Sequence, residues 1–148
     1  MMFKKILIPL EHTRADGTIL AYAKALADQC GAALVLIHVA DGWVARNLKQ
    51  LDLRESQEMR EDLAYLEREC ASLREAGFDA DAVLAAGEPG KEIAQAAKRE
   101  HCDLIAMATH GHKGLADVVR GSVANEVRHQ SMVPVLMVRV ERRRTPRE

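Results

Sequence analysis

Residues 33–39 read Ala-Leu-Val-Leu-Ile-His-Val, which is apolar at every position except His38. A strand with one face in solvent alternates apolar and polar residues, so this continuous run predicts a strand buried on both faces. Residues 3–9, Phe-Lys-Lys-Ile-Leu-Ile-Pro, contain a similar run, and so do residues 103–108, Asp-Leu-Ile-Ala-Met-Ala. Strands of this kind need helices on both sides of their sheet.

The segments between these strands have the apolar spacing of helices. Ile19, Ala23, Leu26 and Cys30 are three or four residues apart, and Gly31 follows where a helix C-cap belongs. The same reasoning predicts the remaining elements, which are helices from about Glu55 to Gly77, from Pro89 onwards and over Ser122–Gln130, and strands over Phe78–Ala86 and Val133–Val140.

Buried strands and amphipathic helices alternate along the chain of 148 residues. Such alternation predicts a parallel sheet covered on both faces, and right-handed crossovers make that sheet open and doubly wound. We therefore expect an α/β fold in three layers (α/β/α), with five strands in the order 3-2-1-4-5 and four helices. We expect one domain over residues 1–141 and a charged tail over residues 142–148.

The composition favours an aliphatic domain without nucleic-acid or membrane partners. Hydrophobic residues make up 48% of the chain but aromatic residues only 3%, which argues against a platform for stacked bases. Lys and Arg total 21 and Asp and Glu total 22, so the net charge of −1 predicts no general attraction to nucleic acid or anionic lipid. No apolar run approaches the roughly 20 residues that span a bilayer.

The cysteines and the N-terminus indicate a reducing compartment. Cys30, Cys70 and Cys102 are too scattered for a disulfide framework or a zinc site, and we expect small buried side chains there. The apolar run after Lys5 is too short for a signal peptide. We therefore expect a cytoplasmic protein.

In an open α/β sheet a ligand binds at the carboxyl ends of the strands, where the strand order reverses. The most informative segment there is 108–122, which reads Ala-Thr-His-Gly, nine further residues, and then Gly121-Ser122 at the start of the predicted helix. Free amides and a hydroxyl group at a helix N-terminus suit a phosphate. The alternative is that the glycines only shape a turn and Ser122 only caps its helix.

Other nucleotide, metal and catalytic motifs are not found. No G-x-G-x-x-G follows the first strand, and residues 87–92, Gly-Glu-Pro-Gly-Lys-Glu, lack the glycine spacing of a phosphate loop and the Ser or Thr after its lysine. His110 and His112 have no further ligands placed by the sequence, so we predict no protein-made metal site. Glu11 is a candidate base, but no nucleophile and orienting group accompany it, so no catalytic residue is predicted.

Nearly the whole chain resembles the universal stress protein family, in its single-domain, nucleotide-binding branch. The resemblance is strongest where Gly111, nine residues, Gly121 and Ser122 match the family's ATP-binding pattern, G-x-x-G, nine residues, then Gly followed by Ser or Thr. Ala108 stands in place of the first glycine, and Leu10 and Glu11 stand where the family often has Thr-Asp. Further matching stretches are residues 5–9, 37–41, 87–89, 107–111, 121–124 and 133–138.

The resemblance implies a role for each matching position. Glu11 and the backbone of Val39 would face the adenine, the loop around Ala108 would line the ribose and α-phosphate, and Ser122 with its neighbours would hold the outer phosphates. The ligand implied is ATP, or AMP or another adenine nucleotide, with Mg²⁺ or Mn²⁺. The implied binding residues are Pro9, Leu10, Glu11, Val39, Met107, Ala108, Thr109, His110, Gly111, Gly121, Ser122 and Val123.

Ala108 is the smallest possible departure from the glycine of the pattern. If the position needs a left-handed backbone, an L-residue costs roughly 1–2 kcal/mol there. We therefore predict that nucleotide binding is weakened rather than lost.

The last strand is expected at an edge of the sheet. Its residues Val135, Leu136, Met137 and Val138 are all apolar, and an exposed apolar edge invites pairing with another chain. We predict a homodimer with the last strands of two chains apposed, which agrees with what the resemblance implies. The charged stretch 79–82 is expected to protect the opposite edge.

These observations lead to one main hypothesis and two alternatives. The main hypothesis is a regulatory dimer in stress response or signalling that binds ATP or a related adenine nucleotide and acts on a partner protein that the sequence does not name. The alternatives are a dimeric interaction protein that no longer binds nucleotide and a slow ATP hydrolase.

Overall fold

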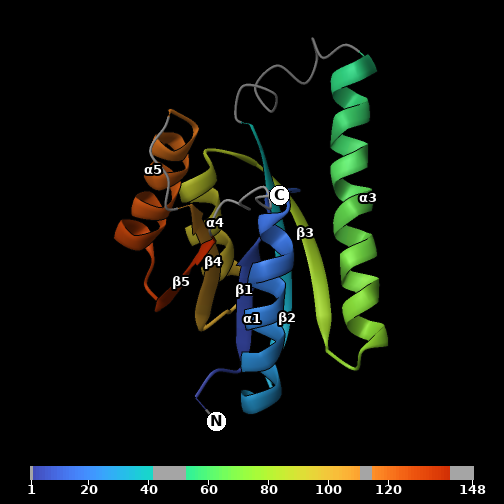
Figure 1. Ribbon diagram of the computed structural model, residues 1–148, viewed down its shortest axis with the longest axis vertical. Coiled ribbons are helices and arrows are strands. Elements are labelled where there is room, and N and C mark those ends of the chain that lie inside the picture. The colour runs from blue at the N-terminus through green and yellow to red at the C-terminus, as the bar shows by residue number, and fades with distance from the viewer. Residues whose placement is uncertain (1, 42–52, 111–114, 141–148) are drawn as a thin grey trace, which may run out of the picture.

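A computed structural model of the chain describes residues 2–41, 53–110 and 115–140, and the side chains of residues 41, 53–56 and 115–122 lie outside that description. Five parallel strands form one sheet in the order β3-β2-β1-β4-β5, which confirms the predicted fold class (Figure 1). The predicted tail over residues 142–148 lies outside the described residues. The strands are β1 (Lys5–Pro9), β2 (Ala33–Asp41), β3 (Ala80–Gly87), β4 (Leu104–His110) and β5 (Val135–Val140), and the helices are α1 (Ala15–Cys30), α3 (Leu53–Glu75), α4 (Pro89–Arg99) and α5 (Leu115–Gln130).

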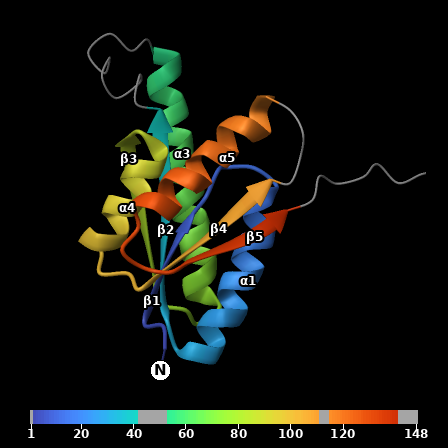
Figure 2. The same cartoon turned by 90° about the vertical axis from the view of Figure 1, so that its left-hand side faces the viewer.

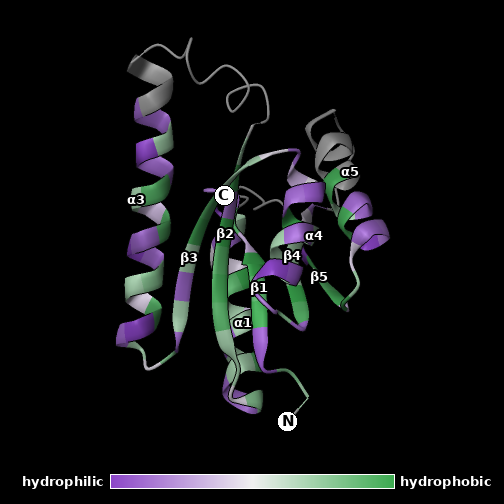
Figure 3. Cartoon of the chain, turned by 180° about the vertical axis from the view of Figure 1, so that it is seen from behind, coloured by the Kyte–Doolittle hydropathy of each residue, from purple (hydrophilic) through white to green (hydrophobic). Residues whose placement is uncertain are grey.

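The described helices cover both faces of the sheet, with α1 and α3 on one side and α4 and α5 on the other (Figure 2). Alternate residues of the central strands point to opposite faces, so Ile6 and Ile8 of β1 pack with α1 and α3 in one apolar cluster. Leu7, from the same strand, packs in a second cluster with Ile93 of α4 and Val127 of α5. Strands that are buried on both faces have hydrophobic residues on both faces. In Figure 3, β2 and β4 are accordingly largely hydrophobic, whereas the helices carry both hydrophobic and hydrophilic residues.

The strand order reverses between β1 and β4. These two strands pair only at Ile6 with Leu104 and at Leu7 with Ile105 among the described residues. The chain leaves β1 towards α1 on one face and leaves β4 towards α5 on the other (Figure 2). The carboxyl ends of β1 and β4 therefore form the topological switch point at which ligands bind in open α/β sheets.

Most predicted boundaries are within two residues of the observed ones, but the start of the last helix was wrong. The prediction began it at Ser122, whereas α5 begins at Leu115. A glycine inside a helix costs only about 1 kcal/mol relative to alanine, and Leu115, Val119, Val123 and Val127 are spaced by four residues. This helical spacing outweighs Gly121, so Gly121 and Ser122 lie within α5 rather than ahead of it.

The two edges of the sheet are protected unequally. On β3, the Arg74 guanidinium donates through Nε to the carbonyl oxygen of Ala80 at 2.8 Å and through Nη2 to Asp81 Oδ1 at 3.3 Å. On β5, Leu136 and Met137 are 37% and 36% exposed. The edge formed by β5, which the sequence predicts to be apolar, therefore has exposed apolar side chains in the described part of the chain. No described helix has both the length and the apolar character required for a membrane span.

Candidate functional site

A pocket of ≈ 270 Å³ lies at the switch point. Its walls come from the carboxyl ends of three strands, from the first turn and a half of α4 and from α5. It is lined by Pro9, Leu10, Glu11, Ile37, His38, Val39, Pro89, Ile93, Met107, Ala108 and Val123.

The structure gathers part of the predicted site in this pocket. Thr109 and His110 continue β4 beyond the pocket wall. Gly111 lies outside the described residues, and Gly121 and Ser122 precede Val123 within α5. The predicted residues that line the pocket are Pro9, Leu10, Glu11, Val39, Met107, Ala108 and Val123.

Four lining residues were missing from the predicted site. Ile37 and His38 precede Val39 on β2, while Pro89 and Ile93 come from α4. Pro89 and Ile93 are four residues apart, so they share one helix face. That spacing, together with the position of residues 87–90 after a strand, is the sequence signal that indicates the α4 wall.

The pocket chemistry suits a flat apolar group with a polar edge. Aliphatic side chains such as Leu10, Ile93 and Met107 form most of the wall, and Glu11 and His38 contribute its ionisable groups. Pockets for whole drug-sized ligands are usually about 300–1,000 Å³. The volume of ≈ 270 Å³ therefore fits one ring system and leaves any attached sugar or phosphate outside.

Ala108 has an ordinary backbone conformation. His12 and His101 are the non-glycine residues with positive φ in the described part of the chain, so Ala108 does not carry the left-handed strain considered for this position. Residue 108 lines the pocket, and its side chain packs against the apolar cluster that contains Ile6 and Ile8.

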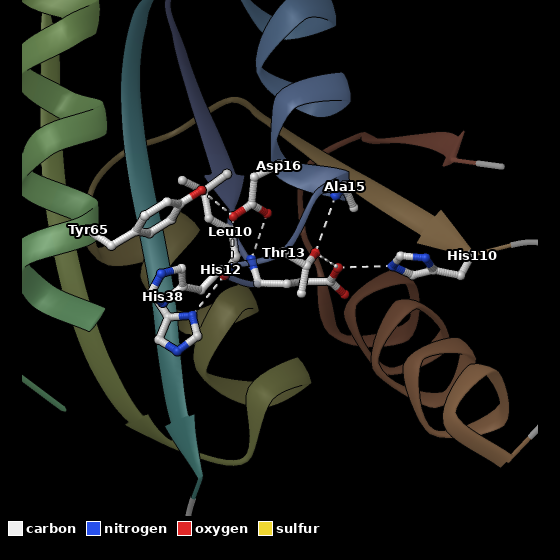
Figure 4. A network of polar contacts seen from close by, with 9 residues as sticks. Leu10, His12, Thr13, Ala15, Asp16, His38, Tyr65 and His110 are labelled. Atoms are coloured by element: carbon white, nitrogen blue, oxygen red, sulfur yellow. Dashed lines mark hydrogen bonds and ion pairs between the residues drawn. The ribbon is translucent and has the colours of Figure 1, made fainter. Parts of the chain in front are cut away.

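Glu11 connects the two strands on either side of the switch point. Its Oε2 accepts a hydrogen bond from Nε2 of His110 at 2.9 Å and one from Oγ1 of Thr13 at 3.3 Å (Figure 4). The Glu11 side chain is 31% exposed and the His110 side chain 12% exposed. The carboxylate is therefore fixed at the pocket wall, where it can accept from a ligand amino group.

The segment that carries Glu11 is held by a buried carboxylate. Asp16 is 2% exposed and accepts three hydrogen bonds, from the amides of Glu11 and His12, both at 2.8 Å, and from the Tyr65 hydroxyl group at 2.6 Å. His12 has a φ of 63°, in the left-handed region, and its amide points at Asp16. Burial and the neighbouring Asp16 raise the pKa of Tyr65 above its ordinary value.

Helix α3 supports the same segment through two histidines. His12 stacks on Tyr65, with ring centroids 4.0 Å apart, and its Nδ1 lies 2.8 Å from Asp62 Oδ1. His38 donates from Nδ1 to the carbonyl oxygen of Leu10 at 2.9 Å, and its Nε2 lies 3.4 Å from Asp62 Oδ2. His38 is therefore hydrogen-bonded within the described part of the chain, although it is the one polar residue of the run 33–39.

Among the side chains that the structure describes, no group of three or more His, Cys, Asp or Glu is placed to hold a metal ion. The candidate site therefore presents the Glu11 carboxylate beside a largely apolar wall.

The chain thus has an open α/β sheet with an apolar pocket at its switch point, which is where open α/β folds bind their ligands. The model of the universal stress protein family matches residues 2–139, and the chain belongs to this family. The universal stress protein YxiE of Bacillus subtilis is 30% identical over 148 aligned residues, covering 93% of this chain and 100% of YxiE. The solved structure of MJ0577, a universal stress protein of Methanocaldococcus jannaschii, has a TM-score of 0.80 and 28% identity, covering 98% of this chain and 100% of that one.

Two further solved structures carry nucleotides. One is a universal stress protein in complex with cAMP, with a TM-score of 0.70 and 17% identity over 94% of this chain and 98% of that one. The other is a universal stress protein from Archaeoglobus fulgidus in complex with dAMP, with a TM-score of 0.66 and 18% identity over 93% of this chain and 98% of that one. At these identities the likeness establishes a shared fold.

Proposed function

We propose that this chain binds an adenine nucleotide at the switch point, with the base in the pocket and the Glu11 carboxylate on its amino edge. The observation that carries the proposal is the pocket itself, which is apolar, large enough for one ring system and has a fixed carboxylate in its wall. Universal stress proteins of the same fold in complex with cAMP and dAMP support an adenine ring as the ligand.

The arrangement of α5 distinguishes one phosphate from three. Inside a helix each amide donates to a carbonyl four residues earlier, so the amides of Gly121, Ser122 and Val123 are not free donors while α5 begins at Leu115. A triphosphate would gain these amides only if α5 began later, near Ser122. A ligand with one phosphate does not need that change. We therefore propose that AMP-like ligands bind the arrangement seen here, and that ATP with Mg²⁺ or Mn²⁺ shortens α5.

The site also supports a regulatory role in a dimer. Leu136 and Met137 lie on the open edge of the sheet, and β5 pairs with β4 up to His110 opposite Val140. His110 in turn donates to Glu11 in the pocket wall. A second copy seated on β5 would therefore be two strands away from the ligand, close enough for occupancy of the pocket to alter the dimer surface.

Isothermal titration with AMP, adenosine and ATP tests the binding proposal. We expect adenosine and AMP to bind, and we expect Glu11→Gln to weaken both by roughly tenfold, since a charge-assisted hydrogen bond contributes about 1.5–3 kcal/mol. Glu75→Gln, an exposed change at the far end of α3, is the matched control. Absence of heat with every ligand at millimolar concentration would refute the proposal. Phosphate release from ATP that Glu11→Gln abolishes would instead indicate a hydrolase.

A further inference from the structure

His38 has an acceptor atom facing each of its ring nitrogens. Nδ1 lies 2.9 Å from the carbonyl oxygen of Leu10 (Figure 4). Nε2 lies 3.4 Å from Oδ2 of Asp62. A carbonyl oxygen and an ionised carboxylate can only accept hydrogen bonds. Both contacts are therefore satisfied together only when both nitrogens of His38 carry a proton.

A neutral imidazole leaves one of these contacts unfavourable. It carries a single ring proton, which the shorter contact with Leu10 assigns to Nδ1, so the lone pair of Nε2 then faces the carboxylate of Asp62. The distance of 3.4 Å is longer than an ordinary N–H···O hydrogen bond of about 2.7–3.2 Å. Addition of a second proton would convert this contact into a charge-assisted hydrogen bond.

We propose that His38 is a proton-operated tie between the pocket wall and α3. With one ring proton it holds only the Leu10 carbonyl on the segment after β1. With two it also binds Asp62, so that β2, this segment and α3 are joined through one side chain. The tie does not depend on the proposed nucleotide, because no ligand takes part in it.

The surroundings of His38 allow this change of charge. Its side chain is 17% exposed, so a proton can reach the ring from solvent. Asp62 is its nearest charged partner and is shared with His12. On the neighbouring strand Leu84 stands opposite His38 in register, and α4 brings Pro89 and Ile93 to the shared pocket, none of which titrates. Further ionisable groups of this region, among the described side chains, are Glu11, Asp16 and Tyr65.

The tie differs from an ordinary structural contact in its response to pH. Histidine changes charge between about pH 5 and pH 8, while the aspartate stays ionised over that range. The connection to α3 is therefore strengthened on acidification and weakened towards alkaline pH. A contact that only filled space would not depend on pH.

Long-range ¹H–¹⁵N NMR spectra of labelled protein test the protonation state directly. We expect a proton on Nδ1 of His38 at both about pH 8 and about pH 5.5, and a proton on Nε2 at the lower pH alone. In Asp62→Asn the fraction of His38 that carries the second proton at the lower pH should fall. In Asp81→Asn, which removes a different carboxylate contact of α3, it should not change. An Nε2 without a proton at about pH 5.5 in the wild-type chain would overturn the proposal.

A double-mutant cycle between His38→Gln and Asp62→Asn measures the energetic coupling and cancels the contribution of His12. We expect the coupling to change the unfolding equilibrium constant by about fivefold at the lower pH, the upper end for a partly exposed ion pair, and to vanish at the higher pH. Equal coupling at both values would overturn the proposal. The wild-type NMR spectra decide the matter even if a variant fails to fold.

Discussion

Tyr65, in the middle of α3, donates its hydroxyl hydrogen bond to Asp16 Oδ2 at 2.6 Å, 49 residues away in the sequence. The bond crosses from α3 to the first turn of α1 and completes the environment of a carboxylate that is 2% exposed. Burial of a charge is costly unless hydrogen bonds compensate it. Asp16 in turn holds the amide of Glu11. The position of Glu11 in the pocket wall therefore depends on the hydrogen bond between Tyr65 and Asp16.

Tyr65→Phe should destabilise the fold by about 1–2 kcal/mol, because it removes one donor from a buried charged acceptor. Asp16→Ala should cost more, since it leaves the amides of Glu11 and His12 without their acceptor. Urea denaturation measures both effects. Tyr22→Phe, at a side chain that is 56% exposed, is the control and should be neutral. If Tyr65→Phe changed the free energy of unfolding as little as Tyr22→Phe does, the Tyr65 hydroxyl group would contribute nothing to stability.

Gly90→Ala should destabilise the fold by about 1–3 kcal/mol through overpacking. A methyl group at this position of α4 would clash with Cβ and Cγ of Glu126 on α5, and Cβ cannot swing away as the end of a side chain can. Gly17→Ala is the matched control, because a methyl group there meets nothing within 4 Å and should stabilise α1 by up to about 1 kcal/mol. The two melting temperatures should therefore move in opposite directions, and parallel shifts would contradict the packing argument.

The strand order was predictable because the sequence contains little ambiguity about burial. Residues 33–39 and 103–108 are apolar on both faces, and such strands occupy the interior of a sheet covered by helices on each side. The C-cap at Gly31 was also predictable, since its φ of 69° is a conformation that glycine adopts without strain.

The polar network behind the pocket was not predictable from the sequence. Asp16, His12 and Tyr65 come together through the folding of α1 against α3, and nothing in the spacing of these residues encodes that contact. The start of α5 was missed for a different reason. A glycine followed by a serine is typical of a helix start, but the helical periodicity from Leu115 continues through Gly121.

Cys102 should resist alkylation in the folded protein. Burial raises the pKa of its thiol to about 11, so the reactive thiolate is scarce at pH values near 8 and becomes abundant only as the pH approaches 11. Burial also raises the pKa of Cys70, whereas Cys30 is only partly buried. Mass spectrometry after iodoacetamide treatment should find Cys30 modified first. Modification of Cys102 at the same rate in native protein would contradict its burial.

Ala108→Val should weaken adenosine binding by at least about tenfold while leaving the fold intact. Residue 108 lies on β4, where a β-branched side chain is favourable, and this residue lines the pocket. We expect two further methyl groups to narrow the space that the proposed base would enter. Ala108→Gly is the complementary variant and should bind at least as tightly as the wild type. Unchanged affinity in Ala108→Val with an unchanged melting temperature would place the ligand elsewhere.

Met137→Lys should separate the proposed dimer into monomers. Met137 is 36% exposed on the edge strand β5, and two copies apposed there would bring two lysines together in an apolar interface, where an unpaired charge is costly. Met132→Lys is the matched control, because this side chain is 90% exposed and precedes the strand. Sedimentation equilibrium should therefore find a dimer for the wild type and for Met132→Lys, and a monomer for Met137→Lys. A dimer in all three proteins would mean that the chains associate through another surface, and a monomer in all three would remove the dimer from the proposal.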